Sequence, residues 1–194
     1  VLDLRRGLLT REVTWRSPGG KELELTFERF ISQTDQHLAV MRCRVTPLNF
    51  SGKVTISSRV NGNVRNYHHL KVQALDVTFS QAQNESGYIL SRTRKSGFEI
   101  GVGVSHKTSP KTIVEGRADG SELIFEAHYE LLQGQVGELE KYVAVTTSRE
   151  TEVDQIGSFV LNHAQAQAET GWNTLFAAHE SFMENYWEHT DIQL

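Results

Sequence analysis

Apolar and polar residues alternate along three successive stretches, namely Lys21–Gln33, His37–Pro47 and Lys53–Val60. The apolar positions of this alternation are Leu23, Leu25, Phe27, Ala39, Met41, Cys43, Val45, Val54, Ile56 and Val60. Successive side chains of a strand point to opposite faces, so each stretch predicts a strand with one dry face and one wet face. Arginine and glutamate on the wet faces are typical of antiparallel sheets, because buried parallel strands have continuous apolar runs.

The same period of two recurs between turn signals along the chain up to residue 150. Further strands are expected at Leu8–Arg16, Leu70–Gln81, Tyr88–Lys95, Phe98–Lys107, Thr112–Ala118, Ser121–Leu132 and Glu138–Arg149. About ten strands with no helical period predict a mainly β chain that folds as an antiparallel β-sandwich over residues 1–150.

Three local signals refine this prediction. Asp119-Gly120 is typical of a tight hairpin. The apolar phase of Leu70–Gln81 shifts by one residue after Ala74, which predicts a β-bulge or a bend. Gly101 and Gly103 share one face of Phe98–Lys107, where a neighbouring backbone could approach closely.

The alternation also predicts which residues lie between the two sheets, since one parity of each strand must be buried. This inter-sheet core is expected to contain Leu23, Leu25, Phe27, Ala39, Met41, Cys43, Val45, Phe98, Ile100, Val102, Val104, Leu123, Phe125, Ala127 and Tyr129.

After Arg149 the period changes to that of helices. Asp154–Thr170 is rich in alanine and glutamine, and Gly171 is a plausible C-cap. The next segment has one apolar stripe at three- and four-residue steps, formed by Trp172, Leu175, Phe176, His179, Phe182, Met183 and Tyr186 and widened by Trp187. Two helices are therefore expected in residues 151–194, and the second needs a surface to pack on.

The composition narrows the function classes. A net charge of −4 over 194 residues provides no basic footprint for nucleic acid and no polybasic membrane patch. The chain has no signal peptide and no apolar run of membrane length, and its one cysteine, Cys43, is expected to be a buried thiol. These features favour a cytoplasmic protein, and the start at Val1 leads us to expect a piece of a longer chain.

No catalytic, cofactor-binding or metal-binding residue is expected from the pattern. The histidines are scattered, at positions 37, 68, 69, 106, 128, 163, 179 and 189, with no spacing typical of metal sites. The acidic residues of Glu22–Glu28 fit a solvated strand face better than a pair for acid–base catalysis. Trp15, Tyr67, Tyr88 and Tyr129 could stack on a sugar ring, although packing in the core or rim is the more frequent role.

Several motifs resemble the N-terminal domain of glycoside hydrolase family 65. They are the stretches Leu2–Arg11, Phe27–Phe30 and Val45–Gly52, together with His179 and Trp187 of a linker pattern that runs into Asp191-Ile192. The family usually has tryptophan where this chain has Met183. This family comprises maltose, trehalose and kojibiose phosphorylases and some hydrolases.

The resemblance implies that the sandwich and the catalytic residues belong to different domains of a longer enzyme. It implies a supersandwich similar to galactose mutarotase, here without its first strands, whose helices pack on an (α/α)6 barrel of the same chain. In the family the barrel holds the glutamate general acid and the phosphate-binding groups, and phosphate displaces the sugar with inversion. The resemblance therefore implies a non-catalytic sandwich with no cofactor. For the parent it implies an α-linked disaccharide and inorganic phosphate as substrates, and it admits a homodimer.

Two other function classes stay open. A free-standing carbohydrate-binding module would present an exposed row of aromatic side chains on a sheet. A mutarotase-like enzyme would bring a histidine and a glutamate together in a concave groove. Neither the disaccharide nor the choice between hydrolase and phosphorylase follows from the sequence.

Overall fold

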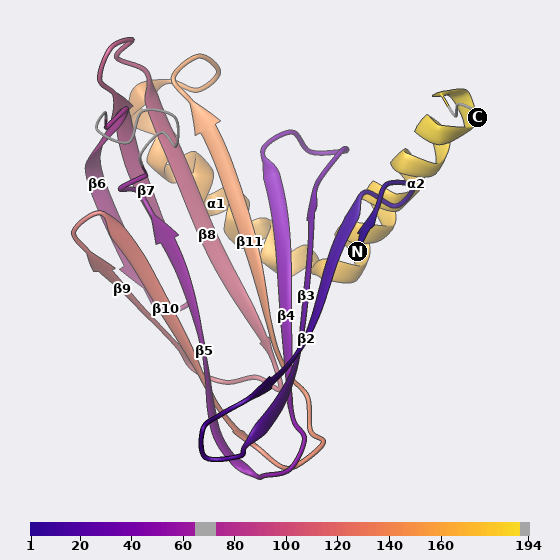
Figure 1. Ribbon diagram of the computed structural model, residues 1–194. Coiled ribbons are helices and arrows are strands. Elements are labelled where there is room, and N and C mark those ends of the chain that lie inside the picture. Colours follow the sequence, from indigo (N-terminus) through magenta and orange to yellow (C-terminus); the bar gives the residue numbers. More distant parts are fainter. Residues whose placement is uncertain (65–72, 191–194) are drawn as a thin grey trace.

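The chain folds as two antiparallel β-sheets packed face to face, followed by two helices (Figure 1). The computed structural model describes residues 1–64 and 73–190. The large sheet has eight strands in the order β1-β2-β3-β4-β11-β8-β7-β6, and the small sheet has three in the order β5-β10-β9. The mainly β, sandwich-like architecture predicted from the alternation is confirmed.

The expected strands are present with small shifts of their ends. The strands are β1 Leu2–Asp3, β2 Leu8–Arg16, β3 Glu22–Ile31, β4 Leu38–Pro47, β5 Gly52–Asn61, β6 Leu75–Gln83, β7 Ser86–Thr93, β8 Glu99–Ser109, β9 Val114–Asp119, β10 Glu122–Leu131 and β11 Gly137–Thr147. Asp119 pairs with Glu122 across the predicted hairpin. The register of β6 shifts between Val77 and Phe79, so the irregularity lies further along the strand than the predicted shift after Ala74, which precedes the first residue of β6. The predicted strand residues Leu70 and Val72 lie outside the described part of the chain.

The inter-sheet core is centred on β10. Leu123, Phe125, Ala127 and Tyr129 are buried there, as the alternation predicts, and they pack with Val45 and Val104 of the large sheet. Leu23, Leu25 and Val102 pack against the same cluster while remaining partly accessible. The predicted parity therefore holds for the part of the large sheet that the small sheet covers.

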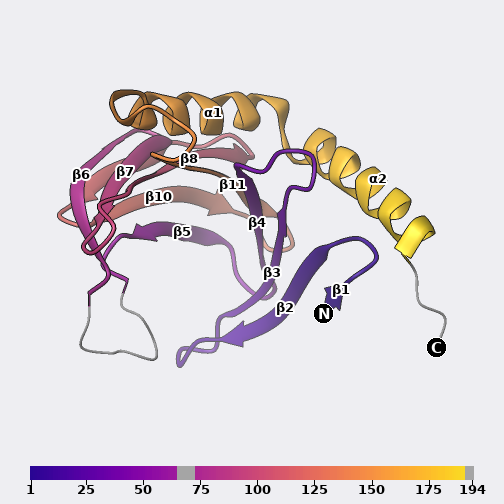
Figure 2. The ribbon, with the colours of Figure 1, turned by 90° about the horizontal axis from the view of Figure 1, so that it is seen from above.

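Three residues of the predicted core are exposed, which corrects the sequence-based assignment. Phe27, Met41 and Phe98 have exposed fractions of 41%, 37% and 40%. For Phe27 and Met41 the reason is the unequal width of the sheets, because a three-stranded sheet cannot cover the inner face of an eight-stranded one. Phe98 instead lies just before the first residue of β8, where the Arg149 guanidinium is 5.5 Å from the centroid of its ring. The view from above shows β5 and β10 under β7, β8 and β11, while β2 and β3 curve away from them (Figure 2).

The prediction of one wet face per strand is also wrong for part of the large sheet. Phe30, Leu38 and Val40 have the parity expected to face water, yet they are buried. They lie under the helical segment, which consists of a 3-10 turn at Val153–Gln155, helix α1 (Ile156–Thr170) and helix α2 (Trp172–Thr190). The large sheet thus has two covered faces, and local alternation cannot reveal the second covering layer.

Helix α1 lies close against the outer face of the large sheet, over β8 and β11 (Figure 2). A β-carbon on Gly103 would stand 2.2 Å from the carbonyl oxygen of Val160, and one on Gly101 would stand 2.4 Å from the Ile156 side chain. The predicted close approach at these two glycines is confirmed, and its partner is α1. Gly171 ends α1, donating its N–H to the carbonyl oxygen of Gln167 at 3.0 Å, as predicted for a C-cap. No helix within residues 1–64 and 73–190 is both long and apolar enough to cross a membrane.

Candidate functional site

Helix α2 is fastened to the sandwich through His179, which is buried. The N–H of Gln33 donates to His179 Nδ1 at 3.3 Å, and His179 Nε2 donates to the carbonyl oxygen of Arg6 at 3.0 Å. Burial lowers the pKa of this imidazole, which is consistent with the neutral form that one donor and one acceptor require. The ring also stacks on Phe30 with centroids 4.9 Å apart.

The turn between β1 and β2, residues 4–7, receives two further contacts from α2. Trp187 Nε1 donates to the carbonyl oxygen of Leu4 at 2.9 Å, and Arg6 Nε lies 2.5 Å from Glu180 Oε1. His179 and Trp187 are the linker residues that the family resemblance singles out, and both bind backbone carbonyls of this turn. We call the contact between residues 4–7 and His179, Glu180 and Trp187 the α2 latch.

An aromatic cluster holds the first turns of α2. The ring of Phe30 makes edge contacts with Trp172 at 5.1 Å and with Phe176 at 5.4 Å between centroids. The guanidinium of Arg42 lies 4.2 Å from the centroid of the Trp172 ring, at cation–π distance. The beginning of α2 is therefore packed as a core element.

The second half of the apolar stripe is only partly packed. Phe182 and Tyr186 have exposed fractions of 44% and 49%, whereas Trp172 and His179 of the same stripe are buried. Helical spacing of 100° per residue puts Phe182 and Tyr186 within about 60° of His179 around the axis, so they continue the docked stripe beyond the edge of the sheet. Figure 1 shows α2 running outward past β2 toward its C-terminal end.

Glu28, one of the acidic residues weighed for catalysis, is held by two ion pairs. Glu28 Oε2 accepts from Arg42 Nη2 at 2.7 Å and from Arg44 Nη2 at 2.8 Å, and only 12% of its side chain is exposed. Burial raises the pKa of nearby Glu138, whose carboxylate lies 3.8 Å from Arg42 Nε. Two guanidiniums hold the Glu28 carboxylate, so this residue belongs to a mostly buried group of ion pairs and not to the solvated strand face that the sequence predicts.

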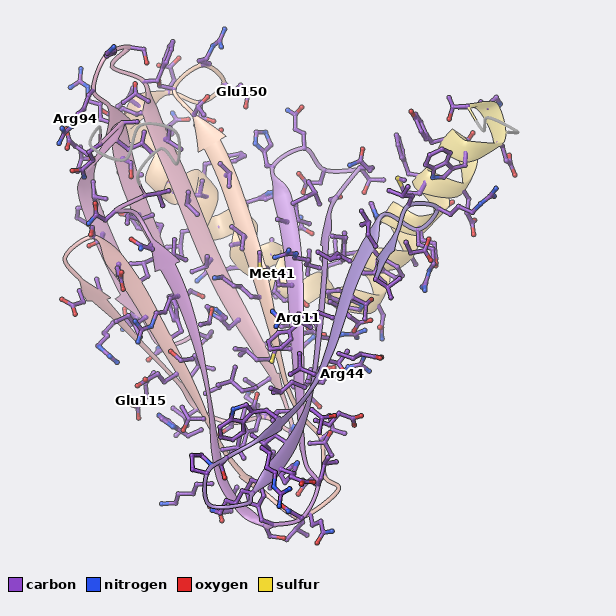
Figure 3. The ribbon with its side chains drawn as sticks, viewed as in Figure 1. Arg11, Met41, Arg44, Arg94, Glu115 and Glu150 are labelled. Atoms are coloured by element: carbon purple, nitrogen blue, oxygen red, sulfur yellow. The ribbon has the colours of Figure 1, made fainter. Side chains whose placement is uncertain are left out.

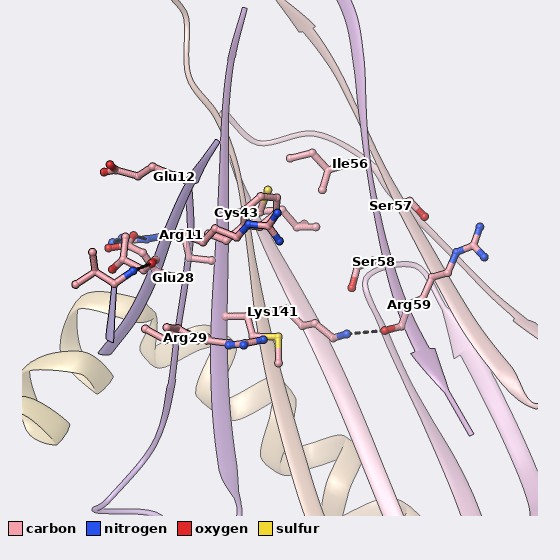
Figure 4. A pocket seen from close by; sticks show the side chains of 17 residues that line it. Arg11, Glu12, Glu28, Arg29, Cys43, Ile56, Ser57, Ser58, Arg59 and Lys141 are labelled. Carbon is pink, nitrogen blue, oxygen red and sulfur yellow. Dashed lines mark hydrogen bonds and ion pairs between the residues drawn. The ribbon is translucent and has the colours of Figure 1, made fainter. Parts of the chain in front are cut away.

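A groove of about 880 Å³ opens between the sheets where they diverge (Figure 4). The large sheet lines this groove with Phe27, Met41, Cys43 and Leu139, and β5 lines it with Ile56. Figure 3 labels Arg11 and Met41 in this region. Burial raises the pKa of the Cys43 thiol to about 11, so little of it is thiolate at neutral pH. The side chain is partly accessible and not fully buried as the sequence predicts.

Lys141 spans the groove from β11. Its Nζ donates to the carbonyl oxygen of Arg59 in β5 at 2.8 Å, and burial lowers its pKa to about 8. Among the described residues that line the groove there is no histidine, so the His–Glu pair of a mutarotase-like site is not formed there.

His106 is buried between the sheets and contacts Ser58, one of the residues that line the groove. Its Nδ1 donates to the carbonyl oxygen of Glu85 at 2.8 Å, so its Nε2 accepts from Ser58 Oγ at 2.9 Å. The arrangement resembles a nucleophile and its base, but burial lowers the pKa of His106 to about 3. An imidazole that resists protonation so strongly cannot take a proton from Ser58 at neutral pH.

The other candidate residues do not converge on one site. His163 Nε2 lies 2.7 Å from Asp35 Oδ2 and ties α1 to the turn before β4, and no group of three or more potential metal ligands occurs within residues 1–64 and 73–190. Tyr129 is buried and Tyr88 stacks on Phe79, whereas Trp15 is exposed on β2. Tyr67, His68 and His69 lie outside the described residues, as does the Asp191-Ile192 end of the linker motif.

The fold and the contacts described above define a class of domain, namely an antiparallel β-sandwich with two helices docked on its larger sheet. The chain matches the family model described as glycosyl hydrolase family 65, N-terminal domain, over residues 1–186. It therefore belongs to glycosyl hydrolase family 65 and represents that family's N-terminal domain.

Two relatives illustrate the relationship. The chain is 27% identical over 205 residues to the α,α-trehalose phosphorylase of Thermoanaerobacter brockii, covering 99% of this chain and 26% of that protein. It is 30% identical over 210 residues to the kojibiose phosphorylase of Halothermothrix orenii, covering all of this chain and 26% of the relative. The chain thus spans about a quarter of the length of these curated relatives.

A solved structure has the same fold. The structure described as a putative kojibiose phosphorylase from the human microbiome superposes with a TM-score of 0.87 at 14% identity, covering all of this chain and 25% of that one. The sandwich and its two helices are therefore a fold shared with a larger protein.

Proposed function

We propose that this chain is the non-catalytic N-terminal sandwich of a longer family 65 enzyme and that it positions α2 as the connection to the catalytic domain. In this proposal residues 1–150 form the sandwich and residues 151–194 lead to an (α/α)6 barrel in the same polypeptide. The parent would act on an α-linked disaccharide, with inorganic phosphate as the acceptor if it is a phosphorylase. A cytoplasmic location belongs to the same proposal and is supported by the one unpaired cysteine.

The observation that carries the proposal is that Phe182 and Tyr186 stay exposed on a helix that is otherwise docked on the sandwich. The latch and the Phe30 cluster fix its direction, while Phe182 and Tyr186 extend beyond the sheet as an apolar surface. Burying a side chain of this size stabilises an interface by about 1.5–3 kcal/mol, so these two rings fit a contact with another domain.

The first experiment compares the enzymatic activity of the 194-residue chain with that of the longer parent enzyme. The 194-residue chain, incubated with maltose, trehalose or kojibiose with and without phosphate, should release neither glucose nor glucose phosphate. The parent should release one of them from at least one α-linked disaccharide. Turnover by the short chain that disappears on replacing one of its own carboxylates would overturn the proposal.

The second experiment tests the exposed rings in the parent. Replacing Phe182 and Tyr186 together by serine should lower the temperature at which the activity is lost, because the contact between the domains is weakened. Ser181→Glu is the matched control, since position 181 lies on the opposite side of α2 and is exposed. Equal behaviour of the double variant and the control would contradict an interdomain role for α2.

A further inference from the structure

A second, smaller pocket lies on the outer face of the large sheet, beside helix α1. Its volume is about 250 Å³, and it is bounded by the β6–β7 hairpin on one side and by α1 on the other. The pocket is separate from the α2 latch and from the groove between the sheets, with which it shares no lining residue. Its polar lining includes Gln81, Gln83, Asn84, Glu85, Tyr88 and Gln165.

The register of the strands explains why amide side chains gather at this pocket. Directly opposed residues share one face of a sheet, which places Gln81 of β6 with Tyr88 of β7 and Gly103 of β8. Gly103 lies against the backbone of α1, so this is the face on which the helix packs. Gln83 is two residues further along β6 and therefore points the same way as Gln81. Gln165 of α1 then faces the hairpin from the opposite wall.

The amide groups of the pocket are available to a ligand. Within residues 1–64 and 73–190, the side chains of Gln81, Gln83 and Gln165 make no hydrogen bond, and neither does the Tyr88 hydroxyl. Each carboxamide has both donors and an acceptor, as a pair of neighbouring sugar hydroxyls also has. Of the described residues that line the pocket, Glu85 alone is charged and none is basic. The lining therefore suits a neutral ligand rich in hydroxyl groups better than an anion.

The turn between β6 and β7 is held rigidly at the end of the pocket. The carbonyl oxygen of Glu85 accepts from the backbone N–H of His106 at 3.0 Å and from its Nδ1 at 2.8 Å. Asn84 has a φ of 51°, a left-handed conformation that asparagine tolerates. A β-carbon on Gly116 would stand 2.3 Å from the Asn84 carbonyl oxygen, so the turn also lies against β9. A wall fixed on two sides loses little freedom when a ligand binds.

An exposed aromatic ring lies next to the pocket. Phe79 points the same way as Gln81, about 7 Å before it along β6, and 43% of it is exposed. Its ring stacks on that of Tyr88 with centroids 5.4 Å apart, which holds it in place. A pyranose ring has one face of C–H groups, and such an apolar face packs on an aromatic ring. Amides beside an aromatic platform match a sugar in both its hydroxyl groups and its ring.

We propose that this pocket is a binding site for a neutral di- or oligosaccharide. One sugar residue places its hydroxyl groups among Gln81, Gln83 and Gln165, and the next packs its ring on Phe79. The inference does not rest on the proposed function, because every residue of the site belongs to this chain.

Titration of the 194-residue chain with maltose, followed by nuclear magnetic resonance, tests the proposal. The side-chain amide signals of Gln81, Gln83 and Gln165 should shift and reach saturation. Sorbitol, which has hydroxyl groups but no ring, and inorganic phosphate, which is an anion, should leave these signals in place. No saturable shift with maltose, or equal shifts with sorbitol or phosphate, would overturn the proposal.

Two substitutions test where the sugar binds. Gln165→Ala should weaken maltose binding by about three- to tenfold, as expected for a lost hydrogen bond, and alanine keeps α1 helical. Gln167→Ala is the matched control, because it makes the same change about 200° further around α1, outside the pocket. Phe79→Ala should weaken the binding of maltose more than that of glucose, since only the disaccharide reaches both the amides and the ring. Equal maltose affinities for Gln165→Ala and Gln167→Ala would show that the sugar binds elsewhere, and the proposal would fail.

Discussion

Gly7 and His179 fit each other so closely that a β-carbon on residue 7 would stand 2.6 Å from the imidazole Nε2. Gly7 also has a φ of +60°, a conformation that side chains of L-residues rarely adopt. The same imidazole binds the carbonyl oxygen of Arg6, so the turn and the helix are shaped for one another. The direction of α2 therefore depends on a residue without a side chain in the N-terminal hairpin.

Gly7→Ala should undock α2 while the sandwich stays folded. The new methyl group collides with His179, which breaks the latch and exposes residues 172–187 to hydrogen exchange. Gly20→Ala is the matched control, because Gly20 has a φ of +82° but nothing within 4 Å of the added carbon. The control should lose about 1 kcal/mol of stability through backbone strain alone. Equal protection of α2 in both variants would contradict the latch.

Phe125→Ala should lower the free energy of unfolding by about 3–5 kcal/mol, as for a large aromatic in a packed core. Phe125 is fully buried at the centre of the inter-sheet cluster. Phe98→Ala is the informative comparison, since the alternation puts both residues in the core while the structure leaves Phe98 exposed. Its loss should be within about 1 kcal/mol, because little apolar area is returned to water. Denaturant titrations of both variants decide between the two descriptions.

The strands and their parity were predictable because alternation is a local property of each strand. The covering layers were not: Phe30 and Val40 are buried because α2 lies over them, and Phe27 and Met41 are exposed because the small sheet ends at β5. The burial of the first pair and the exposure of the second depend on how many strands each sheet contains and on which face of the large sheet the helices pack against.

The contacts of the candidate site could not be predicted from local sequence patterns either. His179 and Trp187 were recognised through the family resemblance, but their partners are backbone carbonyls of Arg6 and Leu4. A carbonyl carries no residue identity, so no pattern of side chains could reveal these two hydrogen bonds. The groove depends on the register of four strands, which the sequence constrains only in parity.

Gly103→Ala should destabilise the protein by lifting α1 from the large sheet. The added carbon would stand 2.2 Å from the Val160 carbonyl oxygen, which belongs to helix backbone and cannot turn aside. We expect a loss of about 1–3 kcal/mol, typical of an overpacked interior. Gly19→Ala, whose added carbon meets only Ser17 Oγ at 3.9 Å, should change the unfolding midpoint far less. A tolerated Gly103→Ala would mean that α1 sits further from β8 than the structure shows.

The stability of the sandwich should fall as the pH is lowered from about 6.5, because His106 is buried in its neutral form. Burial lowers its pKa to about 3, while in the unfolded chain it titrates near its ordinary value of 6.5. Between these two values the unfolded state binds a proton that the folded state does not. The free energy of unfolding therefore decreases with falling pH by up to about 1.4 kcal/mol per pH unit for this one group.

Chemical denaturation between pH 7 and pH 5 measures this contribution together with that of His179, since most carboxylates stay ionised there. At pH 7, His106→Gln should be less stable than the unmodified 194-residue chain, because the hydrogen bonds to Glu85 and Ser58 are disturbed. Its free energy of unfolding should, however, depend less steeply on pH. His128→Gln, at an exposed position on β10, should keep the full pH dependence. The pKa of His179 is lowered in the same direction, so part of the slope should remain in His106→Gln and vanish when both histidines are replaced. Parallel pH profiles for His106→Gln and the unmodified chain would show that His106 is not held neutral between the sheets.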